Sequence, residues 1–280
     1  MWLLISSVLC SVAVSVLLKL AKQHRIHIAQ AIAFNYVSAS LLTLLLLRPS
    51  PSSLLVPQTP YWVVIALGVL LPSIFIVMAQ AVRHAGIVLS DAAQRLSLII
   101  PLVAAVLIFG EVLQGIKWLG IILGLGALAC LSLGSKKAEQ SMTASAPVWL
   151  LGVWLGYGVI DVLFKQLSKS GAGFSSSLLV TFVLAAVLLF SWLTWRRTAW
   201  QLPSMVAGLF LGLLNFGNIY FYIRAHQFFP DNPTLVFATM NIGVISLGTL
   251  IGAGLFKEKL SLWNGVGIGL ALCAVTALLP

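Results

Sequence analysis

The sequence predicts an all-α integral membrane protein with ten transmembrane helices, arranged as two inverted repeats of five helices each. Composition is the first observation: of 280 residues, 60% are hydrophobic and only 8% are charged, whereas a soluble domain carries roughly 25% charged residues. The second is a series of apolar runs about 20 residues long, the length that spans a bilayer. The third is an internal repeat, which in an apolar chain is typical of a secondary transporter.

The apolar runs are distributed equally between the two halves of the chain. We expect helices at 2–21, 28–47, 61–82, 88–109 and 114–133, and again at 147–168, 174–195, 203–226, 233–256 and 261–279. They define a first repeat at 1–134, a polar linker at 135–146 and a second repeat at 147–280. Continuous apolar blocks argue against a membrane β-barrel, whose strands alternate in polarity. Because five is odd, the second repeat enters the membrane from the opposite side.

The ends of the two halves carry the clearest repeat. Residues 109–124 read FGEVLQGIKWLGIILG and residues 256–271 read FKEKLSLWNGVGIGLA, so that Glu111 falls on Glu258. In both segments a helix ends in Gly-Glu or Lys-Glu, a leucine follows two residues later, and a glycine-rich helix comes next. We expect both glutamates to cap or pair locally.

This motif, the ten runs and the tandem halves resemble the drug/metabolite transporter superfamily, in its EamA-like branch. The resemblance covers essentially the whole chain. It implies a central cavity between the halves and the export or exchange of amino acids, metabolites, drugs or sugar derivatives. It also implies cytoplasmic termini, whereas the distribution of Lys and Arg predicts termini outside, so the orientation stays open.

Polar side chains inside the apolar runs are the candidate site residues, because a charge at the centre of a membrane helix costs about 2.5–3.5 kcal/mol. Asn215, Asn218 and Tyr222 share one helix face. Two amides and a phenol beside aromatic rings suit a substrate with an apolar body and a few polar groups. Interhelical hydrogen bonding is the alternative role.

The equivalent positions of the two repeats add further candidates. Gln94 and Asn241 fall on each other when the repeats are superposed, and both are expected near the central axis. Asn35 and Tyr36 are expected to line the same cavity, with ordinary packing as the alternative.

Charged candidates occur as pairs one helical turn apart. Asp91 precedes Arg95, and Asp161 precedes Lys165, so that each pair can neutralise itself. In the functional interpretation, Asp161 or Asp91 titrates during transport, which would make protons the coupling ion, or Arg95 and Lys165 attract an anionic group.

Glycines predict where helices approach closely. Small-xxx-small pairs occur at Gly120 and Gly124, at Gly248 and Gly252, and at Gly265 and Gly269. Pro101 lies inside the run 88–109 and permits it to bend.

Other classes of protein fit less well. The net charge of +10 comes from basic residues in short gaps between apolar runs, so it predicts membrane flanks and no nucleic-acid partner. The three cysteines have no CxxC partner, so we expect no metal and no cofactor. Neither Asp91 nor Asp161 lies in the GxGD context of an intramembrane aspartyl protease, and we expect no enzymatic activity.

The sequence therefore predicts a secondary active transporter of small metabolites or amphipathic compounds, an exporter or exchanger working by alternating access. Its expected partners are the lipid bilayer of a bacterial-type inner (plasma) membrane and a small-molecule substrate. A lipid-linked substrate translocase or scramblase without ion coupling is the alternative. Monomer and homodimer both stay open. The runs 28–47, 88–109, 147–168, 174–195, 203–226 and 233–256 are expected to line the cavity.

Overall fold

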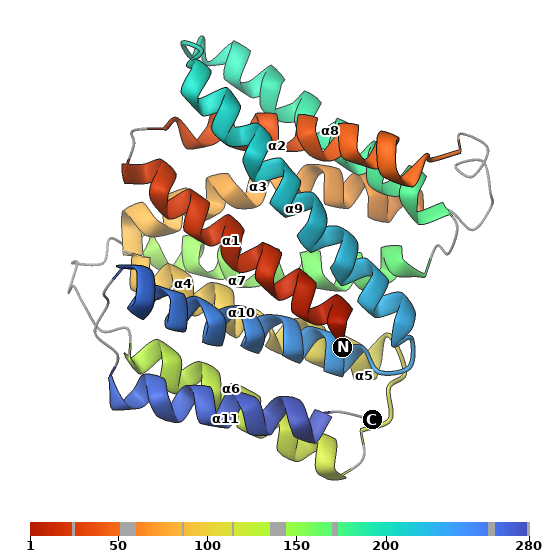
Figure 1. The fold of residues 1–280 in the computed structure, drawn as a ribbon, viewed down its shortest axis with the longest axis vertical. Helices are drawn as coiled ribbons and strands as arrows, with labels where there is room; N and C mark the ends of the chain where they lie inside the picture. The colour runs from red at the N-terminus through yellow and green to blue at the C-terminus, as the bar shows by residue number, and fades with distance from the viewer. Residues whose placement is uncertain are drawn as a thin grey trace.

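The computed structural model describes residues 1–23, 26–50, 60–85, 87–113, 115–134, 144–169, 173–256 and 261–278, and all its regular structure in these ranges is helical (Figure 1). The helices are α1 (Trp2–Gln23), α2 (Ile28–Leu42) with the π-helical turn η1 (Thr43–Leu47), α3 (Tyr61–Ala85), α4 (Ile87–Leu96), α5 (Ile99–Leu107), α6 (Gly115–Gly134), α7 (Ala146–Ser168), α8 (Phe174–Trp195), α9 (Leu202–Phe228), α10 (Pro233–Phe256) and α11 (Leu262–Leu278).

Within the described ranges, six helical segments are long and apolar enough to cross a membrane, and the protein is an α-helical membrane protein. These segments are Ile28–Leu47, Tyr61–Ala85, Ala146–Ser168, Phe174–Trp195, Leu202–Phe228 and Pro233–Gly254. Four shorter apolar stretches, Trp2–Leu18, Ala93–Leu107, Gly115–Cys130 and Gly265–Leu278, accompany them.

The prediction of one helix over residues 88–109 is wrong. The segment forms two helices, α4 and α5, with a turn at Ser97 and Leu98 between them. Pro101 gives the physical reason, since proline has no N–H to donate to the carbonyl of Ser97. That carbonyl accepts from the backbone N–H of Ile100 instead, at 3.0 Å, and the N–H of Leu98 donates to the carbonyl of Arg95 at 3.2 Å. The bend that the proline permits is therefore a complete break in the helix.

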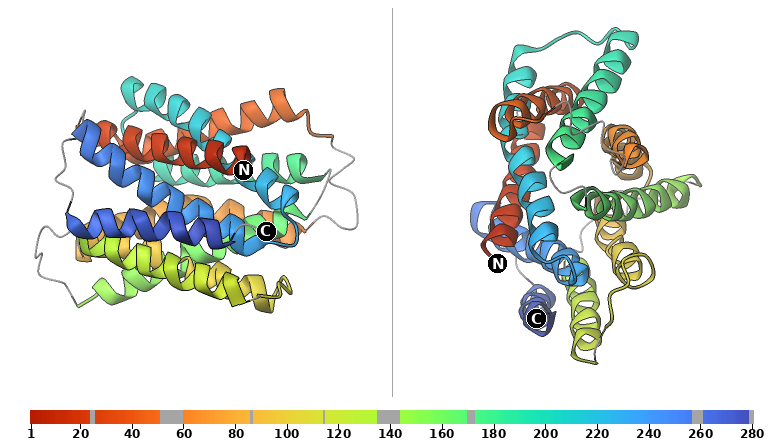
Figure 2. Two further views of the ribbon diagram at one scale, coloured as in Figure 1. Left: turned by 60° about the horizontal axis from the view of Figure 1, so that its bottom comes forward. Right: turned by 90° about the vertical axis from the view of Figure 1, so that its right-hand side faces the viewer.

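The helices lie side by side in two rows, which the right-hand view of Figure 2 shows. One row contains α1, α9 and α10, and the facing row contains α3, α7 and the α4–α5 pair. At the ends of the assembly, α2 packs with α8 and α9, and α6 packs along α11 (Figure 1).

α2 and α9 cross closely, and the crossing depends on Gly208 and Gly212. A Cβ at Gly212 would lie 2.5 Å from the carbonyl oxygen of Asn35 and 2.5 Å from the Cβ of Ser38. A Cβ at Gly208 would collide with the backbone of Ala31. Only glycine lets the two backbones approach this closely.

The predicted glycine pairs have mixed outcomes. Gly120 and Gly124 do face α11 and α10, where an added Cβ would meet Leu278 at 2.7 Å and Ile242 at 2.9 Å. By contrast, an added Cβ at Gly248, Gly265 or Gly269 would meet no described atom within 4 Å. A small-xxx-small spacing permits another helix to approach closely, but it does not show that a helix packs against that face.

Candidate functional site

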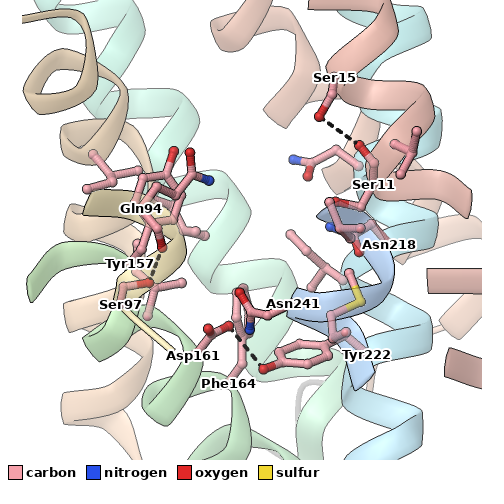
Figure 3. A pocket seen from close by; sticks show the side chains of 18 of the residues that line it. Ser11, Ser15, Gln94, Ser97, Tyr157, Asp161, Phe164, Asn218, Tyr222 and Asn241 are labelled. Carbon is pink, nitrogen blue, oxygen red and sulfur yellow. Dashed lines mark hydrogen bonds between the residues drawn. The ribbon is translucent and has the colours of Figure 1, made fainter. Parts of the chain in front are cut away.

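A cavity of about 450 Å³ lies between the two rows of helices (Figure 3). Helices of both halves of the chain line it. Its lining residues are Ser11, Val12, Ser15, Tyr36, Leu71, Ile74, Phe75, Gln94, Arg95, Ser97, Tyr157, Ile160, Asp161, Phe164, Asn215, Asn218, Ile219, Tyr222, Met240, Asn241, Val244, Ile245 and Gly248.

The cavity brings together most of the predicted site residues, which come from α2, α4, α7, α9 and α10. These are Tyr36, Gln94, Arg95, Asp161, Asn215, Asn218, Tyr222 and Asn241. Asn35 lies outside the lining and is 1% exposed. Successive helix residues point about 100° apart, and Asn35 lies on the part of α2 that faces Gly212 of α9.

A hydrogen-bonded cluster of polar side chains forms one end of the cavity (Figure 3). The phenol of Tyr222 donates to Oδ1 of Asp161 at 3.0 Å. The amide of Asn241 is the second polar neighbour of this carboxyl, and its Nδ2 donates to the carbonyl of Phe237 at 3.0 Å. The ring of Phe164 packs edge-on against Tyr222, 6.2 Å between centroids. The cluster joins α7, α9 and α10 beneath the cavity.

The expected pair of Asp161 with Lys165 does not form, because the two side chains take different partners. Nζ of Lys165 donates to the carbonyl of Pro230 at 2.9 Å, away from the carboxyl. Asp161 is thus hydrogen-bonded by neutral groups. The side chain of Asp91 lies outside the described residues, so the pair that it was expected to make with Arg95 remains a prediction.

The facing wall is built from α1 and α9. Oγ of Ser7 donates to Asn218 at both its Oδ1 and its backbone oxygen, each at 2.9 Å. With its oxygen held by Ser7, the side-chain amide of Asn218 keeps its N–H donors for another partner. On the other wall, Oγ of Ser97 donates to the carbonyl of Gln94, so the break between α4 and α5 lies at the cavity surface.

Two helices line the cavity that sequence reasoning did not select. α1 contributes Ser11 and Ser15, and α3 contributes Phe75. Single serines and phenylalanines are common in membrane helices, so nothing in their local sequence marks them. α8, which was expected in the lining, contributes no residue, because it packs between α2 and α3 at the outer end of the rows.

Chemically, the lining combines one carboxyl, one guanidinium, several amides and hydroxyls, and a larger apolar surface that includes Tyr36 and Phe75. Such a lining binds molecules with an apolar body and a few polar groups. No group of three or more His, Cys, Asp or Glu side chains arranged to hold a metal ion occurs in the part of the chain that the structure describes. Fold and site together define the class, an α-helical membrane protein with an internal cavity of mixed polarity.

Comparison with known proteins places the chain in a family. It is 49% identical over 280 residues to an uncharacterized protein of Haemophilus influenzae, with 98% of this chain and 96% of that protein covered. The chain belongs to the same family as that protein. No family model matches the sequence. A protein solved by crystallography superposes with a TM-score of 0.76 over 99% of this chain and 94% of its own, at 14% identity, so the two share a fold.

Proposed function

We propose that the protein is a secondary active transporter of small metabolites or amphipathic compounds, of the EamA-like drug/metabolite transporter type. The observation that carries this proposal is the cavity of about 450 Å³ with a carboxyl, a guanidinium and amides among apolar helices. Polar groups at such positions are costly in a bilayer and usually mark the path of a substrate or ion. The volume falls in the range of small-molecule sites, about 300–1,000 Å³.

The proposed architecture has ten membrane crossings in two inverted repeats, with α4 and α5 crossing together. In this arrangement α1, α2 and α3 correspond to α7, α8 and α9. Packing supports it, because equivalent pairs of helices are in contact: α3 with α7 and α9 with α1, and likewise α2 with α9 and α8 with α3. The pairs α2–α8 and α6–α11 then lie on the pseudo-two-fold axis. A backbone detail recurs as well: Arg48 after α2–η1 and Arg197 after α8 both have left-handed φ angles, 44° and 49°.

Alternating access follows if the two rows rock about the cavity, exposing it first to one side of the membrane and then to the other. The proposed coupling ion is the proton, and its proposed site is Asp161, the one carboxyl among the described lining residues. Transport that is indifferent to a proton gradient would contradict this part of the proposal. The proposed location is a bacterial-type inner membrane.

Ligand-induced thermal stabilisation of the purified protein against a metabolite panel tests the proposal. A ligand at 100 times its Kd stabilises the folded state by about 2.7 kcal/mol, which raises the melting temperature measurably. Asn218→Ala should abolish the shift for a true ligand. Asn35→Ala makes the same substitution outside the cavity, and should keep the shift relative to its own ligand-free melting temperature.

For a compound that stabilises the protein, the next measurement is its flux into proteoliposomes that contain the protein. A ligand that is transported, and whose flux Asn218→Ala reduces, supports the transporter. Stabilisation that both asparagine variants retain would move the site away from α9. No stabilisation by amino acids, nucleosides, vitamins or amphipathic drugs would count against a solute transporter.

A lipid-linked substrate translocase or scramblase is the second candidate. The observation in its favour is a groove of about 520 Å³ between α1, α2 and α9, lined almost wholly by apolar residues such as Leu17, Pro203 and Phe210. Such a groove suits an acyl chain. Lipid scrambling by the reconstituted protein, without flux of any solute, would favour it.

A further inference from the structure

Glu111 is one of only six acidic residues in the chain, and its side chain is 1% exposed. It follows α5, where Gly110 has a left-handed φ of 70° and the N–H of Glu111 turns back to the carbonyl of Ala105 at 2.9 Å. Glycine adopts this backbone conformation without the steric cost that a side chain would add. The turn at Gly110 and Glu111 therefore directs the carboxylate of Glu111, in the first half of the chain, toward α10 in the second half.

Both oxygens of this carboxylate are used. Oε1 accepts from Nζ of Lys117 at 3.0 Å, and Oε2 accepts from the backbone N–H of Thr234 at 2.8 Å. Thr234 lies in the first turn of α10, whose N–H groups have no partner within the helix. A carboxylate at a helix N-terminus satisfies such a donor and interacts favourably with the helix dipole.

The loop before α10 is held from two further directions. Nζ of Lys117 also donates to Oδ1 of Asn232 at 2.6 Å. Nζ of Lys165, from α7, donates to the carbonyl of Pro230 and lies 5.8 Å above the ring of Phe109. We name Glu111, Lys117, Asn232 and the first turn of α10 the clamp. It joins the segment after α5 to the segment before α10.

Packed aromatic rings separate the clamp from the cavity. His226 is 1% exposed, and neither of its ring nitrogens has a hydrogen-bond partner among the residues that the structure describes. Its ring lies 4.8 Å from that of Tyr222 and 4.7 Å from that of Phe237. Tyr222 in turn holds Asp161 at the end of the cavity. The packed rings of Tyr222, His226 and Phe237 thus separate the cavity from the side of the protein that carries the clamp, which we call the closed face.

The opposite end of α10 is loosely packed. Every residue at 233–240 is buried, whereas most at 243–254 are half-buried or exposed. A Cβ at Gly248, which lines the cavity, or at Gly254 would meet nothing within 4 Å. α10 is therefore most tightly packed at the end that the clamp holds, so releasing the clamp would remove its main restraint at that end.

We propose that the clamp is the gate of the closed face, and that the cavity opens to this face only when Glu111 releases Thr234. The proposal rests on the proposed alternating access and adds the residues that hold one of its two states. Release costs a buried charge-assisted hydrogen bond, but water that enters the opened face solvates the carboxylate again. A two-state equilibrium controlled by a few such contacts is the usual basis of a conformational switch.

Thiol labelling tests the gate without any substrate. In a background with Cys10, Cys130 and Cys273 replaced by alanine, Thr234→Cys puts a near-isosteric thiol inside the clamp. A second reporter, Ser15→Cys, lies in the cavity. The rate of reaction with a small, charged methanethiosulfonate reagent in detergent then measures how often each position is open.

The single acceptor oxygen of Glu111→Gln can serve Lys117 or Thr234 but not both. We therefore expect this variant to speed labelling at position 234 by about ten-fold or more, the effect of losing a hydrogen bond to a charged group worth about 1.5–3 kcal/mol. The same variant should slow labelling at position 15, because opening one face closes the other. Asp231→Asn is the matched control: it removes a carboxylate from the same loop, but an exposed one, and should change both rates by less than about two-fold.

Faster labelling at 234 with an unchanged rate at 15 would mean local loosening and would overturn the gate. Equal rates in the Glu111 and Asp231 variants would overturn it as well. If Glu111→Gln does not fold, Lys117→Gln is the second variant, because it removes the charge that pairs with Glu111 and bridges to Asn232. The weakened clamp should again release Thr234 more often and speed labelling at position 234. Reciprocal labelling without any solute flux would leave the gate standing and count only against transport.

Discussion

The contact between α2 and α9 predicts that Gly212→Ala destabilises the protein, although alanine is the better helix former. The new Cβ would lie 2.5 Å from the oxygen of Asn35, whereas ordinary contact begins near 3.4 Å. The two backbones must separate by about 1 Å, a gap that forfeits a quarter to a half of the attraction between the facing atoms. Overpacking of this kind costs about 1–3 kcal/mol.

Gly269→Ala is the matched control, because its Cβ would meet nothing within 4 Å. It makes the same substitution inside a membrane helix and should show only the propensity gain, up to about 1 kcal/mol. Thermal unfolding in detergent, followed by tryptophan fluorescence, should place the melting temperature of Gly212→Ala roughly 3–10 °C below wild type. Gly269→Ala should melt at or above wild type. Equal melting temperatures for the two variants would refute the close crossing of α2 and α9.

Two further predictions concern buried hydrogen bonds. Gln30→Leu removes the side chain that donates to the carbonyl of Ala199 and accepts from the N–H of Gln201. We expect this variant to lose about 1–3 kcal/mol of stability in the same melting assay. An unchanged melting temperature would contradict the two assigned hydrogen bonds. Tyr222→Phe deletes the donor to Asp161 while keeping the ring, so the melting temperature should fall by no more than a few degrees while the affinity of any cavity ligand changes. An unchanged affinity would separate this cluster from the binding site.

Most of the helices could be predicted from the sequence, because a 20-residue apolar run has few alternatives to a helix. Most of the candidate site could be predicted too. Asp161 and Asn218 stand out in apolar surroundings, and such groups turn inward. Helical periodicity does not show which of two adjacent polar residues faces the cavity. The sequence therefore predicts both Asn35 and Tyr36 in the lining, whereas only Tyr36 lines the described cavity.

The remaining features depend on which helices meet, which local sequence does not encode. Ser11 and Ser15 line the cavity because α1 packs on α9 and α10. Lys165 turns from Asp161 to Pro230 because the loop before α10 comes within its reach. The spacing of Gly265 and Gly269 matches that of Gly208 and Gly212, yet only the second pair has a helix against it.

The bond between Gln30 and Ala199 also has a consequence for how the protein is made. Its two partners are 169 residues apart in the chain. At about 5–20 residues per second of synthesis, α2 enters the bilayer on the order of ten to thirty seconds before the segment that satisfies its polar side chains. During that interval α2 presents Gln30, Asn35 and Ser38 without their final neighbours. The nascent first half should therefore depend on the insertion machinery or on membrane chaperones until α8 and α9 arrive.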